Sequence, residues 1–216
     1  MKIKKKIKVA IDSPAAAGAR TQAKLISKHY NLFYLDTGKI YRLIGFYKIN
    51  NKKKFNYNYI RKRMKGLKIN SLENKKLLSD EVGVAASIVA KDKKIRKIVF
   101  NFQKKCAYNF PKKYNGSCLD GRDITYKIVP DADFKFFITA SLKTRAKRRY
   151  LELKRLKNNI TFKEVLKSVK SRDKNDYNRK ISPLTSKYSM LINSENLSKK
   201  ACFLKIKKIM DRKIKN

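Results

Sequence analysis

A loop early in the chain carries residue types that suit phosphate binding. Residues 13–21 read SPAAAGART and follow the apolar segment Val9–Ile11, and an amphipathic helical pattern starts at about Thr21. Small side chains let backbone N–H groups approach a ligand, and the first turn of a helix presents further N–H groups to an anion. This order of strand, loop and helix predicts a cradle for phosphate oxygens.

The loop departs from the G-x-x-x-x-G-K-[ST] pattern of phosphate-binding loops. Gly18 is in place, and Thr21 follows one position late. At the other positions Ser13 replaces the first glycine, Ala19 replaces the lysine and Arg20 replaces the hydroxyl residue. Taken alone, the stretch fits a plain strand, turn and helix as well as it fits a phosphate site.

Three further clusters combine arginines with carboxylates. They read LDTGKIYR (35–42), LDGRD (119–123) and RDKNDYNR (172–179), the last followed by Pro183 and Leu184. The first two come where a predicted strand gives way to a turn, and α/β folds gather their ligands there. The third lies in a polar run that we expect to connect two helices. Because arginine binds phosphate bidentately, the clusters indicate a phosphate-bearing ligand.

Apolar runs and turn signals predict strands that alternate with helices. The expected strands are 9–11, 31–35, a short one in 117–121, 133–139 and about 189–192. The expected helices start at about 21 and 37, fill 80–102 as one or two helices, and cover 141–156, 161 to about 172 and 197–213. For residues 50–78 we expect a peripheral segment that is helical or irregular. The alternation predicts an α/β fold with a parallel sheet covered on both faces.

The composition limits the classes of partner. Of 216 residues 57 are basic and 16 acidic, which gives a net charge of +41 and can indicate nucleic acid. The basic residues are spread over almost every segment and no RNA-binding signature accompanies them, so we favour compositional drift over a specific nucleic-acid site. No apolar run approaches the roughly 20 residues that span a membrane. We expect a cytoplasmic protein without membrane association, whose three cysteines are free buried thiols.

Five ordered motifs resemble those of the bacterial cytidylate kinases, which are nucleoside monophosphate kinases. IDSPA, LDTGKIYR, GRD, TASLKTRAKRR and RDKNDYNRKISPL match the family's IDGPA-type loop, LDTG-x-x-YR, GRD, TAS-x-x-x-RA-x-RR and RD-x-x-D-x-x-R-x-x-x-PL over nearly the whole chain. The resemblance implies a P-loop NTPase-type parallel sheet core flanked by helices, with a reduced NMP-binding insert and a helical lid. It implies one kinase domain, with the core at about 1–42, 103–144 and 183–216, the acceptor-nucleotide segment at 43–102 and the lid at 145–182.

The resemblance also implies the reaction and its residues. ATP would donate a phosphoryl group to CMP or dCMP, a transfer that needs positioning and charge neutralisation. The implied ATP-binding residues are Ser13, Pro14, Ala15, Ala16, Ala17, Gly18, Ala19, Arg20 and Thr21. The implied CMP-binding residues are Thr37, Arg42, Ser87, Arg96, Arg122, Asp123, Arg172, Asp176 and Arg179. The implied catalytic residues are Arg20, Arg122, Arg145 and Arg179.

Each part of the acceptor nucleotide has its own implied partners. The phosphate matches Arg42, Arg122 and Arg179; the cytosine matches Ser87, Arg96 and Asp123; the ribose matches Arg172 and Asp176; and Thr37 lies beside the same nucleotide. A carboxylate at Asp123 accepts from the amino group of cytosine and opposes the carbonyl of uracil. For Ser87, packing within an Ala-rich helix remains an alternative. Arg145, Arg148 and Arg149 lie at the start of the lid segment, which closes over ATP in the family.

Ala19 is the main departure from the family pattern. Losing the lysine ordinarily costs on the order of a hundredfold or more in rate. Arg20 is our hypothesis for a substitute cation, and Lys24 or an arginine of the lid are alternatives. Magnesium would arrive with ATP and bind through waters near Thr21 and Asp120. A second departure is Ile124–Tyr126, where a bulky Tyr126 replaces a small residue.

Two functions therefore remain open on the sequence. The favoured one is an ATP-dependent CMP or dCMP kinase that acts as a monomer. The alternative is a weakened or inactive kinase-like protein that binds nucleotides, or that binds RNA through its basic surface. The presence of the acceptor-side arginines and acids favours the enzyme.

Overall fold

The computed structural model describes residues 6–156 and 159–215, which form two compact units. The sheet unit comprises the chain up to Asp36, residues 104–141 and the chain from Leu184 onward. The helical unit comprises residues 37–103 and 142–183. Among the described residues, no helix has the length and apolar character needed to cross a membrane.

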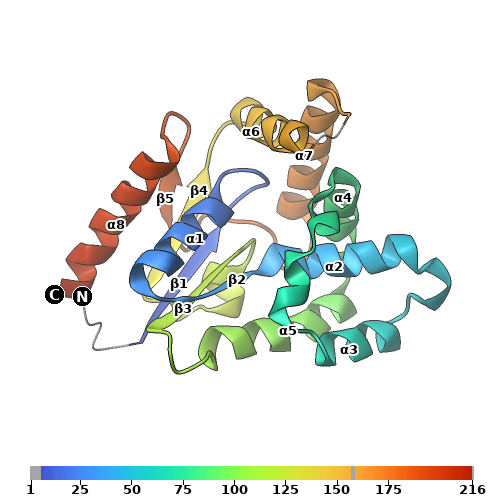
Figure 1. The fold of residues 1–216 in the computed structure, drawn as a ribbon, viewed down its shortest axis with the longest axis horizontal. Coiled ribbons are helices and arrows are strands. Elements are labelled where there is room, and N and C mark those ends of the chain that lie inside the picture. Colours follow the sequence, from blue (N-terminus) through green and yellow to red (C-terminus); the bar gives the residue numbers. More distant parts are fainter. Residues whose placement is uncertain (1–5, 157–158, 216) are drawn as a thin grey trace. The chain divides into compact units, whose positions relative to one another are not determined.

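A parallel sheet is the centre of the sheet unit (Figure 1). Its strands are β1 (Ile7–Asp12), β2 (Phe33–Asp36), β3 (Gly116–Gly121), β4 (Phe134–Thr139) and β5 (Met190–Asn193), in the order β2-β3-β1-β4-β5. All four pairings are parallel. Because the inner strands are covered on both faces, β3 is buried at every position, and β1 and β4 are buried at most of theirs. The predicted α/β fold with a parallel sheet is confirmed.

Helices α1 (Ala19–Tyr30) and α8 (Lys199–Lys215) pack on this sheet. Ile26 of α1 and Ile206 of α8 share one buried cluster with the sheet residue Phe136. Helix α1 ends because Asn31 adopts a left-handed conformation with φ 53°, and for that reason β2 starts at Phe33 instead of the predicted residue 31. The three cysteines are free and buried, as predicted.

The helical unit contains α2 (Thr37–Asn50), α3 (Tyr57–Lys65), α4 (Asp80–Val89), α6 (Leu142–Arg155) and α7 (Phe162–Asn178), and α5 (Lys93–Tyr108) begins in it. Helices α2 and α4 pack closely at Gly45, where an added Cβ would lie 2.8 Å from the backbone nitrogen of Ala86. The segment 50–78 is helical in parts, and 80–102 forms two helices separated at Ala90, both within the predicted alternatives.

Helix α7 corrects one prediction. It begins at the expected capping box, in which the Thr161 Oγ1 accepts from the Glu164 N–H and Glu164 accepts from the Thr161 N–H. It continues to Asn178 instead of ending near Arg172, so the cluster 172–179 is not a connection between helices. No glycine or proline interrupts this polar run before Pro183, and helix propensity alone is too weak to end a helix that packs on α4 and α6.

Two left-handed residues shape the loop between β1 and α1. Gly18, which precedes the helix, has φ 100°, and Ala16 has φ 61°. Glycine adopts this conformation without steric cost, whereas the Cβ of alanine collides with the backbone and costs about 1 kcal/mol. The loop therefore has a strained backbone at Ala16.

Replacing Ala16 with glycine should raise the free energy of unfolding by about 1 kcal/mol, because it removes this steric cost. The matched control is Ala17→Gly, which should lower it by a similar amount, since Ala17 is buried and is not in the left-handed region. Urea denaturation of the three proteins measures both changes. Destabilisation of equal size in both variants would contradict the assignment of strain to residue 16.

Candidate functional site

The loop 13–18 presents its backbone at the amino end of α1. The loop is held at both sides: the Ser13 N–H donates to the Gly121 carbonyl at 3.2 Å, and the Ala17 N–H donates to the Pro14 carbonyl at 3.4 Å. No side chain caps α1, because the preceding residue is Gly18. The first-turn N–H groups and the positive end of the helix dipole are therefore suited to an anion.

Ser194, which follows β5 at the same end of the sheet, also fixes the loop. Its buried hydroxyl lies 3.1 Å from the Ala17 carbonyl oxygen and 3.0 Å from the Thr139 carbonyl oxygen, and its N–H donates to the same Thr139 oxygen at 2.8 Å. The turn after β5 is thus tied both to the end of β4 and to the phosphate loop. Sequence analysis missed this residue, because an isolated serine at a strand end carries no signal of a long-range contact.

Asp12 joins the end of β1 to the segment that follows the GRD motif. Its carboxylate is fully buried and accepts from the Ile124 N–H at 2.8 Å, the Thr125 N–H at 2.9 Å and the Thr125 hydroxyl at 2.6 Å. Burial raises the pKa of Asp12 to about 6, against these hydrogen bonds, which lower it. The same segment accommodates the bulky Tyr126, whose ring stacks on Tyr188 with 5.3 Å between ring centroids.

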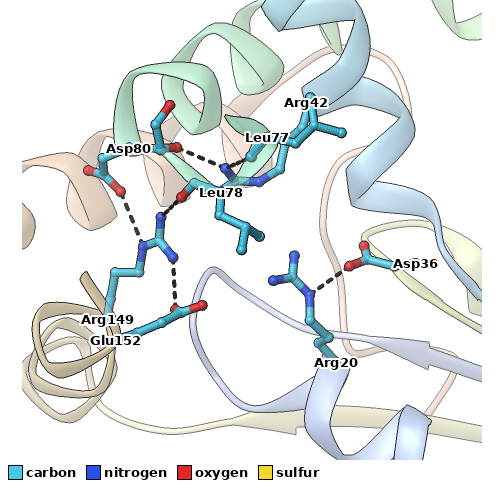
Figure 2. Close-up of polar contacts among 9 residues, drawn as sticks. Arg20, Asp36, Arg42, Leu77, Leu78, Asp80, Arg149 and Glu152 are labelled. Carbon is cyan, nitrogen blue, oxygen red and sulfur yellow. Dashed lines mark hydrogen bonds and ion pairs between the residues drawn. The ribbon is translucent and has the colours of Figure 1, made fainter. Parts of the chain in front are cut away.

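Two carboxylates and Arg20 meet at the ends of β2 and β3. Asp36 and Asp120 are paired in the strand register, and Arg20 donates from Nε to Asp36 Oδ2 at 2.6 Å (Figure 2). Tyr34 donates its hydroxyl to Asp120 Oδ1 at 2.8 Å. Burial, and after it the negative charge of Asp36, raises the pKa of Asp120 well above its ordinary value.

The remaining sheet-unit candidates follow β3 directly. Arg122 is half-buried and donates to the Gly121 carbonyl at 3.0 Å, and Asp123 is buried beside it. Thr21 lies in the first turn of α1, where it is half-buried. Lys24, one turn further along the helix, is exposed. The structure thus brings the loop, Arg20, Asp120 and Arg122 to one end of this unit, while Lys24 lies on the outer face of α1.

In the helical unit, Arg42 is buried against α4. Its Nη1 donates to the carbonyls of Leu77 at 2.6 Å and Ser79 at 2.9 Å (Figure 2). Gly83 makes this possible, because a Cβ there would lie only 2.7 Å from the Arg42 Nη2. Arg149 binds the same stretch from α6, with contacts to the Leu78 carbonyl and to Asp80.

The other helical-unit candidates form ion pairs or pack on rings. Arg145 Nη2 lies 2.7 Å from Asp173 Oδ2, and Arg179 Nη1 lies 3.3 Å from Asp176 Oδ1, with both members of the second pair buried. Arg96 lies over the Tyr41 ring at 5.5 Å and donates to the Ala90 carbonyl. These contacts hold the guanidinium groups in place, which favours binding of a planar or anionic ligand.

Ser87, Thr37 and Arg172 have simpler surroundings. The Ser87 hydroxyl donates to the Val84 carbonyl of its own helix at 2.8 Å and accepts from the Asn175 amide at 3.1 Å, so it also links α4 to α7. Thr37 is buried at the start of α2, and Arg172 is half-buried on α7. The helical unit therefore gathers all its candidate residues on α2, α4, α5, α6 and α7 or beside their ends.

Comparison with known proteins gives a consistent family. A family model described as Cytidylate kinase matches residues 9–212. Proteins named Cytidylate kinase are similar to the chain: one from Bartonella tribocorum at 39% identity over 90% of both chains, and one from Thermosipho melanesiensis at 36% over 96% of this chain and 98% of its own. An uncharacterized protein from Eubacterium ventriosum shares the fold, with a TM-score of 0.54 and 20% identity over 95% of this chain and 99% of that one.

Replacing Asp120 with asparagine should flatten the dependence of stability on pH. Because the folded-state pKa of Asp120 is raised, the folded protein holds more protons than the unfolded protein between about pH 4 and that raised pKa. The free energy of unfolding of the wild type should therefore fall as pH rises through this window. Asparagine can still accept from Tyr34 but does not titrate. Denaturation between pH 5 and 8 measures the slope, and an unchanged slope in Asp120→Asn would contradict the expectation.

Proposed function

The chain belongs to the cytidylate kinase family, and we propose that it transfers the γ-phosphoryl group of ATP to CMP or dCMP, giving ADP and CDP or dCDP. The observation that carries this is the family match over residues 9–212. The same span contains the phosphate loop and the arginine clusters described above. Nothing comparable favours the alternative of a weakened or inactive kinase-like protein that binds nucleotides or RNA.

We assign the donor nucleotide to residues 13–21. The unblocked amino end of α1 and the loop backbone suit the β and γ phosphates, whose negative charge the helix dipole favours. Phosphoryl transfer needs charge neutralisation and alignment more than a protein nucleophile. Arg20, Arg122, Arg145 and Arg179 are the cations that we assign to that task.

We assign the acceptor nucleotide to the residues that the family motifs imply for it. Arg42, Arg122 and Arg179 hold its phosphate; Ser87, Arg96 and Asp123 surround its base; Arg172 and Asp176 hold its ribose; and Thr37 lies beside it. Arg42 is suited to this because two carbonyls fix its Nη1, which leaves the orientation of its guanidinium plane defined. In the same proposal residues 43–102 form the acceptor segment, residues 145–182 form the lid, and the protein acts as a monomer.

Magnesium fits this proposal as an ion brought by ATP. Among the described residues no group of three or more histidine, cysteine, aspartate or glutamate side chains could hold a metal by itself. Magnesium keeps several waters and binds mainly to substrate phosphates, with one or two protein oxygens. In this proposal no protein side chain binds the ion directly, and its waters lie near the Thr21 hydroxyl and the Asp120 carboxylate. When bound, the ion would neutralise charge on the phosphates.

The proposed function predicts a kinase that is selective for cytosine nucleotides. Purified protein with ATP and magnesium should phosphorylate CMP and dCMP well above UMP and AMP in a coupled assay of ADP release. Asp123→Asn should reduce the preference for CMP over UMP at least tenfold, because an amide can face either a donor or an acceptor. Absence of turnover with every nucleoside monophosphate would refute the proposed activity.

A second prediction concerns the support of Arg42. Gly83→Ala should raise KM for CMP roughly tenfold and leave KM for ATP unchanged, because the new Cβ displaces the guanidinium from its two carbonyls. The matched control is Gly66→Ala, whose Cβ would meet no atom within 4 Å. Equal KM values for CMP in the two variants would show that this contact does not position Arg42 for CMP.

A further inference from the structure

The phosphate loop lacks the cation that its pattern requires. Ala19 is the first residue of α1, is 3% exposed and packs in the buried cluster of the sheet unit. No charge can come from this position. Since the lysine of the pattern contacts the β and γ phosphates, a working site needs another cation at the amino end of α1.

Arg20 is a cation of the sheet unit whose position is defined by an ion pair. Its Nε lies 2.6 Å from Asp36 Oδ2, in an ion pair whose carboxylate side chain is only 5% exposed and whose arginine side chain is 34% exposed. Figure 2 shows the two terminal nitrogens of Arg20 directed away from Asp36. Asp36 thus holds the guanidinium through Nε, and the two terminal nitrogens of an arginine can bind a phosphate bidentately.

Asp36 is itself held in place. It ends β2, which pairs in register with β3, so that Asp36 lies opposite Asp120. The Tyr34 hydroxyl binds Asp120 on the same edge of the sheet. Because Asp36 ends one of two paired strands, it is a rigid anchor. A long arginine side chain ordinarily loses rotamer entropy when it binds a ligand, and an anchored one loses less.

The other candidate cations have different contacts. Lys24 is exposed on the outer face of α1. Arg145 and Arg149 each form an ion pair with a carboxylate of the helical unit, Asp173 and Asp80 respectively. Of these candidates, Arg20 is the one that follows the loop directly in sequence and is held by an ion pair within the sheet unit.

Building on the proposed kinase activity, we propose that Asp36 is a positioning residue that holds Arg20 through Nε, so that the terminal nitrogens of Arg20 bind the donor phosphates in place of the missing lysine. Asp36 acts through Arg20 and touches no substrate. A purely structural pair, in which Arg20 only neutralises Asp36 and Asp120, is the competing explanation.

The experiment compares the arginine at position 20 with a lysine introduced at position 19. Arg20→Ala should lower kcat/KM for ATP on the order of a hundredfold. The double variant Ala19→Lys with Arg20→Ser restores the family pattern and should recover activity to within about tenfold of the wild type. Lys24→Ala, which removes an exposed charge one helical turn away, is the matched control and should leave kcat and both KM values unchanged.

Asp36→Asn separates the positioning role from a structural one. It should lower kcat/KM for ATP at least tenfold in the wild-type background, with KM for CMP unchanged, and should have little effect in the Ala19→Lys, Arg20→Ser background. Equal losses in both backgrounds, or an Arg20→Ala variant with wild-type rates, would overturn the proposal. Melting temperatures of all variants identify any loss that comes from unfolding.

A binding readout keeps this test independent of turnover. The shift in melting temperature caused by ATP in the presence of EDTA should be smaller in Arg20→Ala and Asp36→Asn than in the wild type. A wild type that binds ATP but does not phosphorylate CMP would refute the proposed function alone. A wild type whose ATP shift is unchanged by both substitutions would refute the role of Arg20 and Asp36 alone.

Discussion

The parallel register of β2, β3 and β1 brings negative charge to one edge of the sheet. Asp36 lies opposite Asp120, and Asp12 ends β1 opposite Gly121. Buried carboxylates are costly unless they are hydrogen-bonded or paired. The neighbouring elements are arranged accordingly: α1 supplies Arg20, β2 supplies the Tyr34 hydroxyl, and residues 124–125 fold onto Asp12. The loop, the GRD motif and the start of α1 are positioned by these contacts.

In the helical unit the buried charged groups are mainly arginines, and carbonyls and carboxylates hold them in place. Arg42 and Arg149, from α2 and α6, both bind backbone carbonyls within the stretch 77–79. Arg145 and Arg179 pair with Asp173 and Asp176, which come from the polar end of α7. The chain has only 16 acidic residues against 57 basic ones, and two of these acids pair with motif arginines. Fixed guanidinium groups lose little entropy when a phosphate binds.

Much of the fold follows from local sequence signals, and the contacts at the site do not. The strand Phe134–Thr139 was predictable because apolar β-formers are bounded by turn residues, and the start of α7 because a capping box is local. The end of α7 was not predictable, because polar residues without glycine or proline are compatible with both helix and loop. The contacts of Asp12 with Thr125 and of Ser194 with Ala17 join residues that are far apart in sequence. The sequence identified Arg20 as a candidate cation, but its ion pair with Asp36 required the structure.

In the family pattern one loop supplies both the backbone N–H groups and the lysine charge that bind phosphate. In this chain the loop backbone keeps the left-handed conformation at Gly18 and tolerates it at Ala16, so the N–H groups that suit phosphate are preserved. Its charge has moved from position 19 to position 20. Successive residues of a helix point about 100° apart, so a cation displaced by one residue leaves the helix in a new direction. It can serve the same phosphates only if another group redirects it, and the carboxylate at the end of β2 is placed to do so.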